Sequence, residues 1–261
     1  MKRKEVTTEL GKINFAYQEG DPLIVYLNGF GSFDTAQSFQ KVIESLPNNY
    51  GVFAPDYLNS GFSGKSLRNY TITDEAIQLA KIINHLKAKK VIILAHSIGG
   101  VYAMQMKDTV NNLKAFISIE PTTREIILNP PKESAYSENS KTMDEIEKKI
   151  KSDLARILTP EEDKDFWSIT EKNVEKFDEK DNQNAQSCLE NDLFWKSDKK
   201  LDDDIPSIII TEEYREEEYK RSEYHTDNPK SKVVTLGDYH YIHFEYPKKI
   251  ADIVKKADKS I

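Results

Sequence analysis

The sequence is poor in cysteine and has no long apolar run. Cys188 is the single cysteine among 261 residues, which excludes a disulfide within the chain and a metal site built from several cysteines. No stretch approaches the roughly 18 to 20 apolar residues of a membrane span, and the basic segment 1–12 lacks the apolar run of a signal peptide. We therefore expect a cytoplasmic protein without a membrane span.

An excess of positive charge is absent as well. The formal net charge is -7 at pH 7, and the isoelectric point is about 5.4. Because Lys and Arg supply most of the non-specific affinity for phosphates, an acidic chain has little electrostatic reason to bind nucleic acid or anionic lipid. We expect a small-molecule substrate and no nucleic-acid partner, and the oligomeric state stays open.

Short apolar runs alternate with amphipathic stretches along most of the chain. Continuous runs of this kind predict strands buried on both faces. Residues 71–90 place apolar side chains on one stripe behind Thr71 or Thr73 as the helix N-cap. The alternation predicts an α/β fold with a mostly parallel sheet flanked by helices, in which ligands bind outside the carboxyl ends of the strands. The strand-like runs are residues 12–18, 23–27, 50–55, 90–95, 113–120, 205–211 and 231–237.

Residues 121–204 differ in character from the rest. They contain Pro130 and Pro131 and then three charged, helix-like stretches without a strand signal. At this chain length one large domain with an excursion is favoured over two independent domains. We predict a core formed by residues 1–120 and 205–261, with 121–204 as a helical insertion. The three helical stretches are residues 143–158, 159–177 and 185–201, and further helices are expected at 213–224 and 246–259.

Ser97 stands where an apolar run gives way to a helical pattern, in the sequence AHSIGG (95–100). Small residues at Ala95, Gly99 and Gly100 would relieve crowding in a tight turn. A serine here is either a nucleophile or a helix cap, and caps are common. A nucleophilic serine also requires a base, an orienting carboxylate and donors for the oxyanion.

His240 is the strongest candidate for the base. It lies in GDYHYIHFEYP (237–247), after a strand and before the last helix, and would therefore project from the same sheet edge as the serine. The remaining histidines fit other roles: His85 and His225 at the surface, His96 pointing away from the serine, and His243 in packing or hydrogen bonding.

The segment LNGFGSF (27–33) follows another apolar run. Its glycines, Gly29 and Gly31, let a backbone turn expose N–H groups, and the N–H groups of Phe30 and Ile98 would form the oxyanion pair. An ordinary glycine turn is the alternative.

These motifs occur in the order found in the α/β-hydrolase family, which the chain resembles. AHSIGG resembles the nucleophile elbow, NGFGSF the oxyanion turn, APDYLNSGFSGKS (54–66) the second glycine loop, and GDYHYIHFEYP the segment of the catalytic histidine. The resemblance implies Ser97 as nucleophile, His240 as base, no metal or organic cofactor, and a helical cap inserted between the sixth and seventh strands.

Three departures from the family pattern leave the reacting atoms in place. Asn28 replaces the usual His before the oxyanion turn, Ala95 replaces the first Gly of the elbow, and Phe62 and Ser63 shift the second glycine loop.

The acid of the triad is ambiguous in the sequence. Most of the family has an Asp after the strand that corresponds to 205–211, but here the chain continues as EEYREEEY, in which Glu212 or Glu213 could serve. Some relatives place the acid after the strand that corresponds to 113–120, where Glu120 stands. We favour Glu120 because a single carboxylate at a sheet edge can receive the imidazole N–H, with Glu213 as the alternative.

The resulting hypothesis is a serine hydrolase that cleaves a small to medium carboxylic ester through an acyl-enzyme. Amide, thioester, lactone and carbon-carbon bond hydrolysis use the same triad and stay open. A ligand-binding homologue without turnover is the alternative from another class. Four aromatic side chains of the insertion either contact the substrate or anchor the insertion to the core: Phe166, Trp167, Phe194 and Trp195.

Overall fold

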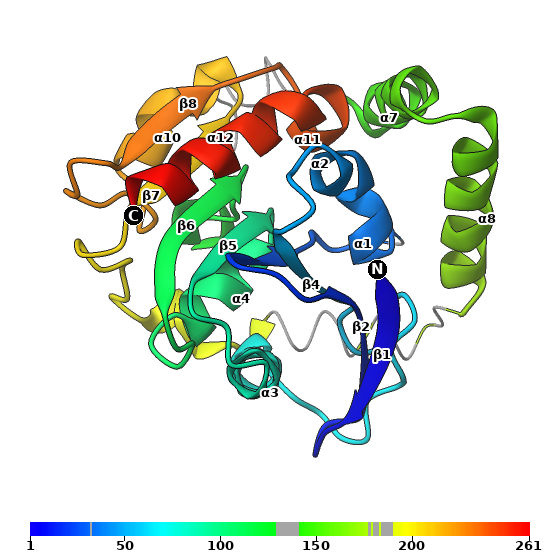
Figure 1. Ribbon diagram of the computed structural model, residues 1–261, viewed down its shortest axis with the longest axis horizontal. Coiled ribbons are helices and arrows are strands. Elements are labelled where there is room, and N and C mark those ends of the chain that lie inside the picture. Colours follow the sequence, from blue (N-terminus) through cyan, green and yellow to red (C-terminus); the bar gives the residue numbers. More distant parts are fainter. Residues whose placement is uncertain (32, 129–140, 177–178, 180–182, 184–189) are drawn as a thin grey trace.

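A single sheet organises the molecule (Figure 1). The computed structural model describes residues 1–31, 33–128, 141–176, 179, 183 and 190–261, and over these residues the sheet has eight strands in the order β1-β2-β4-β3-β5-β6-β7-β8. The first two pairings, β1 with β2 and β2 with β4, are antiparallel, and all the others are parallel. The strands are β1 (Lys2–Thr7), β2 (Lys12–Gln18), β3 (Leu23–Leu27), β4 (Gly51–Pro55), β5 (Val91–His96), β6 (Leu113–Ile119), β7 (Ser207–Thr211) and β8 (Lys232–Thr235).

The seven predicted strands are confirmed as β2 to β8, whereas β1 was missed. All residues of β1 are exposed, so the strand has neither an apolar run nor an alternation that would reveal it. It is held by antiparallel pairing with β2, from Lys2 opposite Tyr17 to Thr7 opposite Lys12. A charged strand at the edge of a sheet also discourages pairing with another chain.

Both faces of the sheet are covered by helices, as the buried strands require. On β3, Leu23, Val25 and Leu27 face one apolar cluster, while Ile24 and Tyr26 face the other. The first cluster packs under α3 (Ile72–His85) and α4 (Gly99–Met106), and the second packs under α2 (Gln40–Glu44) and α12 (Pro247–Ser260). The shorter helical segments are α1 (Thr35–Ser38), α5 (Arg124–Leu128), η1 (Leu193–Lys196), η2 (Glu213–Arg215), α10 (Glu216–Lys220) and α11 (Ile242–Glu245).

Thr71, rather than Thr73, caps α3. Its hydroxyl accepts a hydrogen bond from the backbone N–H of Asp74, and the Asp74 side chain accepts one from the backbone N–H of Thr71. This reciprocal capping box satisfies two N–H groups that the first turn of a helix leaves free.

Two long helices lie between β6 and β7, where the insertion was expected. They are α7 (Met143–Ile157), at the upper right of Figure 1, and α8 (Pro160–Lys176), which runs down the right edge of the view. A third apolar cluster joins them to the end of the chain, with Leu154 and Phe166 packed against Tyr239 and Phe244. Three features noted in the sequence lie outside the described residues: the pair Pro130 and Pro131, Cys188, and the start of the stretch 185–201.

The parallel register brings the carboxyl ends of the central strands to one edge. Leu27 of β3 is opposite Ala95 of β5, and Ile119 of β6 is opposite both His96 of β5 and Ile210 of β7. The residues that follow these strands therefore emerge together at this edge, which is where the sequence placed the site.

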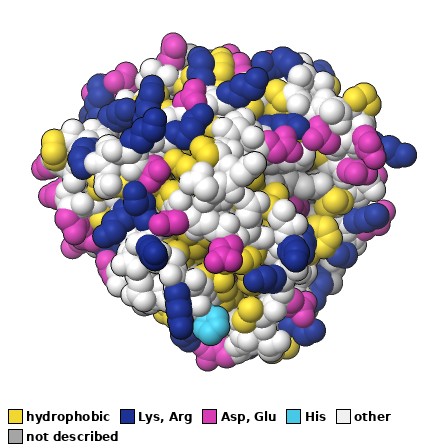
Figure 2. Space-filling model, viewed as in Figure 1, with side chains coloured by type: hydrophobic (Ala, Val, Ile, Leu, Met, Phe, Trp, Pro, Cys, Tyr) yellow, Lys and Arg dark blue, Asp and Glu magenta, His cyan; other side chains and the backbone are white. Residues whose placement is uncertain are grey.

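The surface is mixed in charge. On the face shown in Figure 2, Lys and Arg side chains are interspersed with Asp and Glu, and neither sign forms a continuous field. Among the helices that the structure describes, none has the length and apolar character needed to cross a membrane.

Candidate active site

Ser97 occupies the turn between β5 and α4 in a strained backbone conformation. Its φ angle is 53°, in the left-handed region that L residues other than Gly rarely adopt. The turn is held on both sides, since the N–H of Ser97 donates to the carbonyl of Ile119 at 3.0 Å and its carbonyl accepts from the N–H of Thr122 at 3.0 Å. Such strain at a strand-to-helix turn is typical of a nucleophile elbow.

The helix-cap alternative for Ser97 has no support in the geometry. The N-cap residue of α4 is Ile98, and among the described residues the helix start receives no side-chain hydrogen bond. Ser97 itself is half-buried. A β-carbon on Gly99 would lie 2.4 Å from the carbonyl oxygen of Leu27, so glycine at this position lets the helix start approach the end of β3.

Glu120 and His240 face each other at the same edge of the sheet. Glu120 directly follows β6 with a φ of 46°, and His240 lies in the loop after β8. Oε2 of Glu120 is 3.9 Å from Nδ1 of His240. Glu213, the alternative acid, is exposed on η2, and among the described residues no contact joins it to His240. Of the two predicted acids, the structure therefore brings Glu120 to the histidine.

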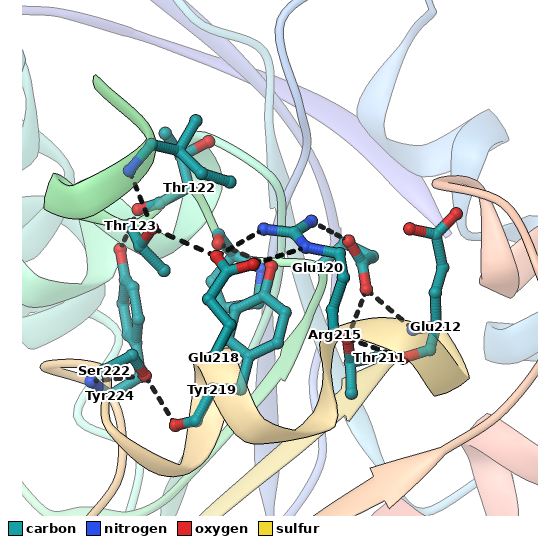
Figure 3. Close-up of polar contacts among 12 residues, drawn as sticks. Glu120, Thr122, Thr123, Thr211, Glu212, Arg215, Glu218, Tyr219, Ser222 and Tyr224 are labelled. Carbon is teal, nitrogen blue, oxygen red and sulfur yellow. Dashed lines mark hydrogen bonds and ion pairs between the residues drawn. The ribbon is translucent and has the colours of Figure 1, made fainter. Parts of the chain in front are cut away.

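The Glu120 carboxylate is fully buried but remains ionised. Burial by itself would raise its pKa, but attraction to His240 and to the Arg215 guanidinium outweighs burial and holds the pKa of Glu120 below its usual value. Its Oε1 accepts hydrogen bonds from the Thr211 hydroxyl at 2.5 Å and from the Glu212 N–H at 2.8 Å, and its Oε2 pairs with Arg215 (Figure 3).

Glu212 is a second buried carboxyl beside this pair. Burial and the neighbouring charge of Glu120 raise the pKa of Glu212, with smaller opposing effects from Tyr214, Arg215 and His240. The two acids therefore differ in their preferred state, because one is held as a carboxylate while the other is biased toward its protonated form.

His96 contacts the loop of His240 and does not simply point away from the site. Its Nε2 lies 3.1 Å from the carbonyl oxygen of His240, and because a carbonyl only accepts, Nε2 carries the hydrogen. Burial, with His243 and His240 as further causes, holds the pKa of His96 well below its usual value, so the ring is neutral. The rings of His96 and His240 lie 4.6 Å apart between centroids.

His243 has the packing and hydrogen-bonding role that the sequence suggested. It stacks on Phe39 with 4.9 Å between ring centroids, and its Nε2 lies 3.1 Å from the hydroxyl of Ser38. Burial and the nearby His240 lower the pKa of His243 to about 3.

The predicted oxyanion turn is held from inside by Asn28. Its side-chain amide donates to the carbonyl of Phe33 at 3.2 Å and accepts from the Ser38 hydroxyl at 3.1 Å, while its backbone carbonyl accepts from the Tyr57 hydroxyl at 2.9 Å. The residue that replaces the family's usual His therefore closes the turn. Sequence reasoning missed this bracing role, although Asn is a residue type that commonly stabilises turns.

The turn passes directly over the serine. A β-carbon on Gly29 would lie 3.0 Å from Nδ1 of His96 and 3.1 Å from Cβ of Ser97. Among the described residues, the backbone N–H groups of Phe30 and Ile98 donate no hydrogen bond to the protein, so both are available to a ligand. A side chain at position 29 would crowd His96 and Ser97, which favours glycine at this point of the turn.

The predicted aromatic residues of the insertion lie in apolar clusters. Trp167 contacts Phe33 and Phe166, with ring centroids at 6.4 and 5.3 Å, and its indole N–H donates to Asp163 at 3.1 Å. Trp195 is 6% exposed and packs on Phe194 at 5.2 Å.

The remaining histidines lie away from these groups. His85 is exposed on α3 and His225 is half-buried after α10. Within the described ranges, no group of three or more His, Cys, Asp or Glu side chains is arranged to hold a metal ion.

Comparison with known proteins identifies the family. Residues 22–245 match the family model described as alpha/beta hydrolase fold, and the chain belongs to this family. Smu.1393c from Streptococcus mutans has a similar crystal structure, with 27% sequence identity, a TM-score of 0.82, and coverage of 98% of this chain and 97% of that one.

Two further solved structures share the fold at lower identity. An N-acyl homoserine lactonase, AidH, in complex with N-butanoyl homoserine is 14% identical with a TM-score of 0.69, over 98% of this chain and 96% of that one. The epoxide hydrolase VrEH1 from Vigna radiata is 19% identical with a TM-score of 0.68, over 100% and 98%. At this identity the likeness shows the fold alone.

A curated relative matches a shorter part of the sequence. The magnesium-chelatase 30 kDa subunit of Rhodobacter capsulatus is 33% identical over 86 residues, which are 33% of this chain and 30% of that protein. The chain therefore matches this relative over less than a third of the relative's own length.

Proposed function

We propose that the protein is a serine hydrolase that cleaves small to medium carboxylic esters through an acyl-enzyme. The Ser97 oxygen attacks the ester carbonyl while His240 takes its proton, and the N–H groups of Phe30 and Ile98 stabilise the oxyanion. His240 then protonates the leaving alkoxide. Water then enters and gives a proton to His240 while its oxygen bonds to the acyl carbon, and the acid is released as His240 returns that proton to the Ser97 oxygen. Glu120 stabilises the imidazolium in both half-reactions.

The observation that carries this proposal is the pairing of His240 with Glu120 beside Ser97. Nδ1 of His240 faces the buried carboxylate at 3.9 Å, which favours the tautomer with hydrogen on Nδ1 and leaves Nε2 as the base. The strained conformation of Ser97 adds support, because strain at such a turn is characteristic of activated nucleophiles. A serine at the elbow also argues against the aspartate-nucleophile chemistry of other members of this fold family.

We further propose that residues 121–204 act as a cap over a core of residues 1–120 and 205–261. The described part of this insertion is bonded to the loop that carries the base, since the Tyr239 hydroxyl donates to Asp153 of α7 at 2.7 Å. Arg156 of α7 also donates to the carbonyl of Glu245 at 2.8 Å. An insertion bonded on both sides of His240 is well placed to shape the access of substrate.

The proposed mechanism applies to several classes of ester. A lactone is an intramolecular ester, and the same steps open it with the alkoxide retained on the acyl group. The similar fold of the lactonase AidH makes N-acyl homoserine lactones a sensible class to include among the substrates tested. Amides serve as the comparison, because an amine is a poorer leaving group than an alkoxide and depends more strongly on protonation by His240.

A fluorophosphonate probe tests the proposal directly. We expect the wild-type protein to be labelled at neutral pH, Ser97→Ala to lose all labelling, and Ser168→Ala on α8 to be labelled like the wild type. In parallel, p-nitrophenyl esters from acetate to decanoate should be hydrolysed by the wild type and not by Ser97→Ala. A folded wild-type protein that is neither labelled nor active on any ester, but binds a small apolar ligand, would instead identify a ligand-binding homologue.

A further inference from the structure

The Glu120 carboxylate is bound by a buried arginine as well as facing His240. The guanidinium of Arg215 is 3% exposed and pairs through Nη1 with Oε2 of Glu120 (Figure 3). On its other side Arg215 binds Glu218, with Nε at 3.0 Å and Nη2 at 2.7 Å from the two carboxylate oxygens. The guanidinium is thus held between two carboxylates and is fixed in orientation.

The surrounding residues fix Arg215 further. Its guanidinium carbon lies 4.7 Å from the centre of the Tyr219 ring, which is itself buried and donates its hydroxyl to the carbonyl of Pro121 at 3.0 Å. Pro121 follows Glu120 in the chain. Arg215 and Glu120 are therefore connected both by their ion pair and through Tyr219, so the cation has little freedom to leave the carboxylate.

Oε2 of Glu120 is shared between Arg215 and His240. The ion pair with Arg215 is direct, whereas Nδ1 of His240 lies at 3.9 Å, beyond hydrogen-bonding distance. Oε1 is already occupied by Thr211 and by the N–H of Glu212. Three donors from β7 and the segment after it thus orient the carboxylate independently of His240.

The arginine has two opposite electrostatic effects on the acid. A carboxyl group as deeply buried as Glu120 would favour its neutral form without a cation nearby, so Arg215 preserves the charge that His240 needs. The same cation competes with the imidazolium of His240 for Oε2, and it therefore weakens the stabilisation of the protonated base.

We propose that Arg215 is a positioning residue of the active site, which holds Glu120 ionised and in place and sets how strongly Glu120 stabilises the protonated form of His240. This inference rests on the proposed function. It adds to the triad a residue that does not touch substrate and acts only through the acid.

In the described part of the site, Arg215 is the cation that competes with the imidazolium of His240 for Glu120. Glu120 and Glu212 face His240 from the ends of β6 and β7, and the neutral rings of His96 and His243 lie near it. When Arg215 is replaced by a neutral residue, the imidazolium of His240 becomes the main cationic partner of Glu120. Protonation of the base is then more favourable, and activity should be lost at a higher pH on the acid side.

The experiment compares Arg215→Gln, Arg215→Lys and the wild type in the hydrolysis of a p-nitrophenyl ester between pH 5 and 9. For Arg215→Gln we expect kcat to fall about tenfold with little change in KM, and the acid limb of kcat/KM to move up by about half a pH unit or more. Arg215→Lys keeps the charge and should keep the acid limb of the wild type. Melting temperatures are measured for every variant.

Arg124→Gln is the matched control. Arg124 is also largely buried and donates to the carbonyls of Ser197 and Lys199, but it contacts neither Glu120 nor His240 among the described residues. This variant should lose stability without moving the acid limb. A purely structural role for Arg215 predicts the same behaviour for Arg215→Gln.

The inference is overturned if folded Arg215→Gln keeps both the kcat and the acid limb of the wild type. Should Arg215→Gln fail to fold, Arg215→Lys decides, because an acid limb raised despite the retained charge would contradict the proposed electrostatic role. These results are distinct from failure of the proposed function, in which the wild type itself would show no labelling and no ester hydrolysis.

Discussion

Nε2 of His96 donates a hydrogen bond to the carbonyl oxygen of His240 across 3.1 Å. His96 is the last residue of β5 and immediately precedes Ser97, so one side chain connects the proposed nucleophile turn with the loop of the proposed base. Its Nδ1 makes no hydrogen bond among the described residues and faces Gly29 in the predicted oxyanion turn. The neutral ring thus touches all three segments of the site.

Replacement of His96 by Phe should therefore impair catalysis more than folding. Phe keeps a flat ring of similar size but removes the donor to His240, so we expect kcat to fall about tenfold or more and the rate of fluorophosphonate labelling to fall in parallel. Steady-state kinetics and labelling rates measure this effect. His85→Gln, at an exposed position on α3, is the control, and a His96→Phe protein with wild-type kcat would show that the contact is dispensable.

The identity of the acid can be decided by a pair of conservative substitutions. Glu120→Gln removes the charge that faces His240, and we expect kcat to fall by about 100-fold or more. Glu213→Gln alters an exposed side chain on η2 and should leave kcat within about twofold of the wild type. Equal activity of Glu120→Gln and the wild type would reassign the acid, and Glu212→Gln would then be the variant to examine.

The sequence predicted well those elements that have a local pattern of apolar residues. A continuous apolar run such as 23–27 predicts a buried strand because both faces of β3 lie against helices. The β1 strand carried no such signal, since it is held by pairing with β2 and by ion pairs of Arg3 with Asp34 and Asp56, and not by burial of its own side chains. Ser97 and His240 were placed at one edge because the order of strands and helices already implies that edge.

The identity of the acid and of its partners depends on contacts between distant segments, which no local sequence pattern reveals. Glu120 and Glu213 each follow a strand, and the sequence offers no means to tell which carboxylate faces inward. The structure separates them through the left-handed φ of Glu120 and the exposure of Glu213. Arg215, a single basic residue in the acidic run EEYREEEY, reads as a surface residue until η2 turns it inward.

A buried carboxyl group away from the site should make stability depend on pH. Glu75 of α3 is fully buried and accepts hydrogen bonds from the Leu58 N–H at 2.6 Å and the Tyr102 hydroxyl at 2.7 Å. Burial raises the pKa of Glu75 from 4.5 to about 7, against the opposing effect of these hydrogen bonds. The folded protein therefore keeps this proton in a pH range where the unfolded chain has lost it.

Proton binding by Glu75 is linked to folding, and this linkage determines how stability changes with pH. Between about pH 4.5 and 7 the unfolded state binds fewer protons at this group than the folded state, so the contribution to stability falls as the pH rises and is constant above pH 7. Since one pKa unit corresponds to about 1.4 kcal/mol, the total is on the order of 3 kcal/mol. Glu75→Gln should lose less stability than the wild type between pH 5 and 8 in urea unfolding. Glu9→Gln, at an exposed position, should follow the wild type, and parallel curves for all three proteins would refute the assignment.

The two tryptophans of the insertion should respond differently to truncation. Trp195 is 6% exposed in the main apolar cluster, so Trp195→Ala should lower the free energy of unfolding by about 3 to 5 kcal/mol and leave the preference for ester chain length unchanged. Trp167 is half-buried and meets Phe33, which ends the predicted oxyanion turn. For Trp167→Ala we expect a smaller loss of stability and a changed ratio of kcat/KM between decanoate and acetate esters.

Trp167→Phe provides the conservative comparison, because it keeps an aromatic ring against Phe33 while it removes the hydrogen bond to Asp163. If ring contact with the turn shapes the acyl site, this variant should retain most of the wild-type ratio between long and short esters. Loss of melting temperature in Trp167→Ala with an unchanged ratio would instead mean that this residue, like Trp195, only anchors the insertion to the core.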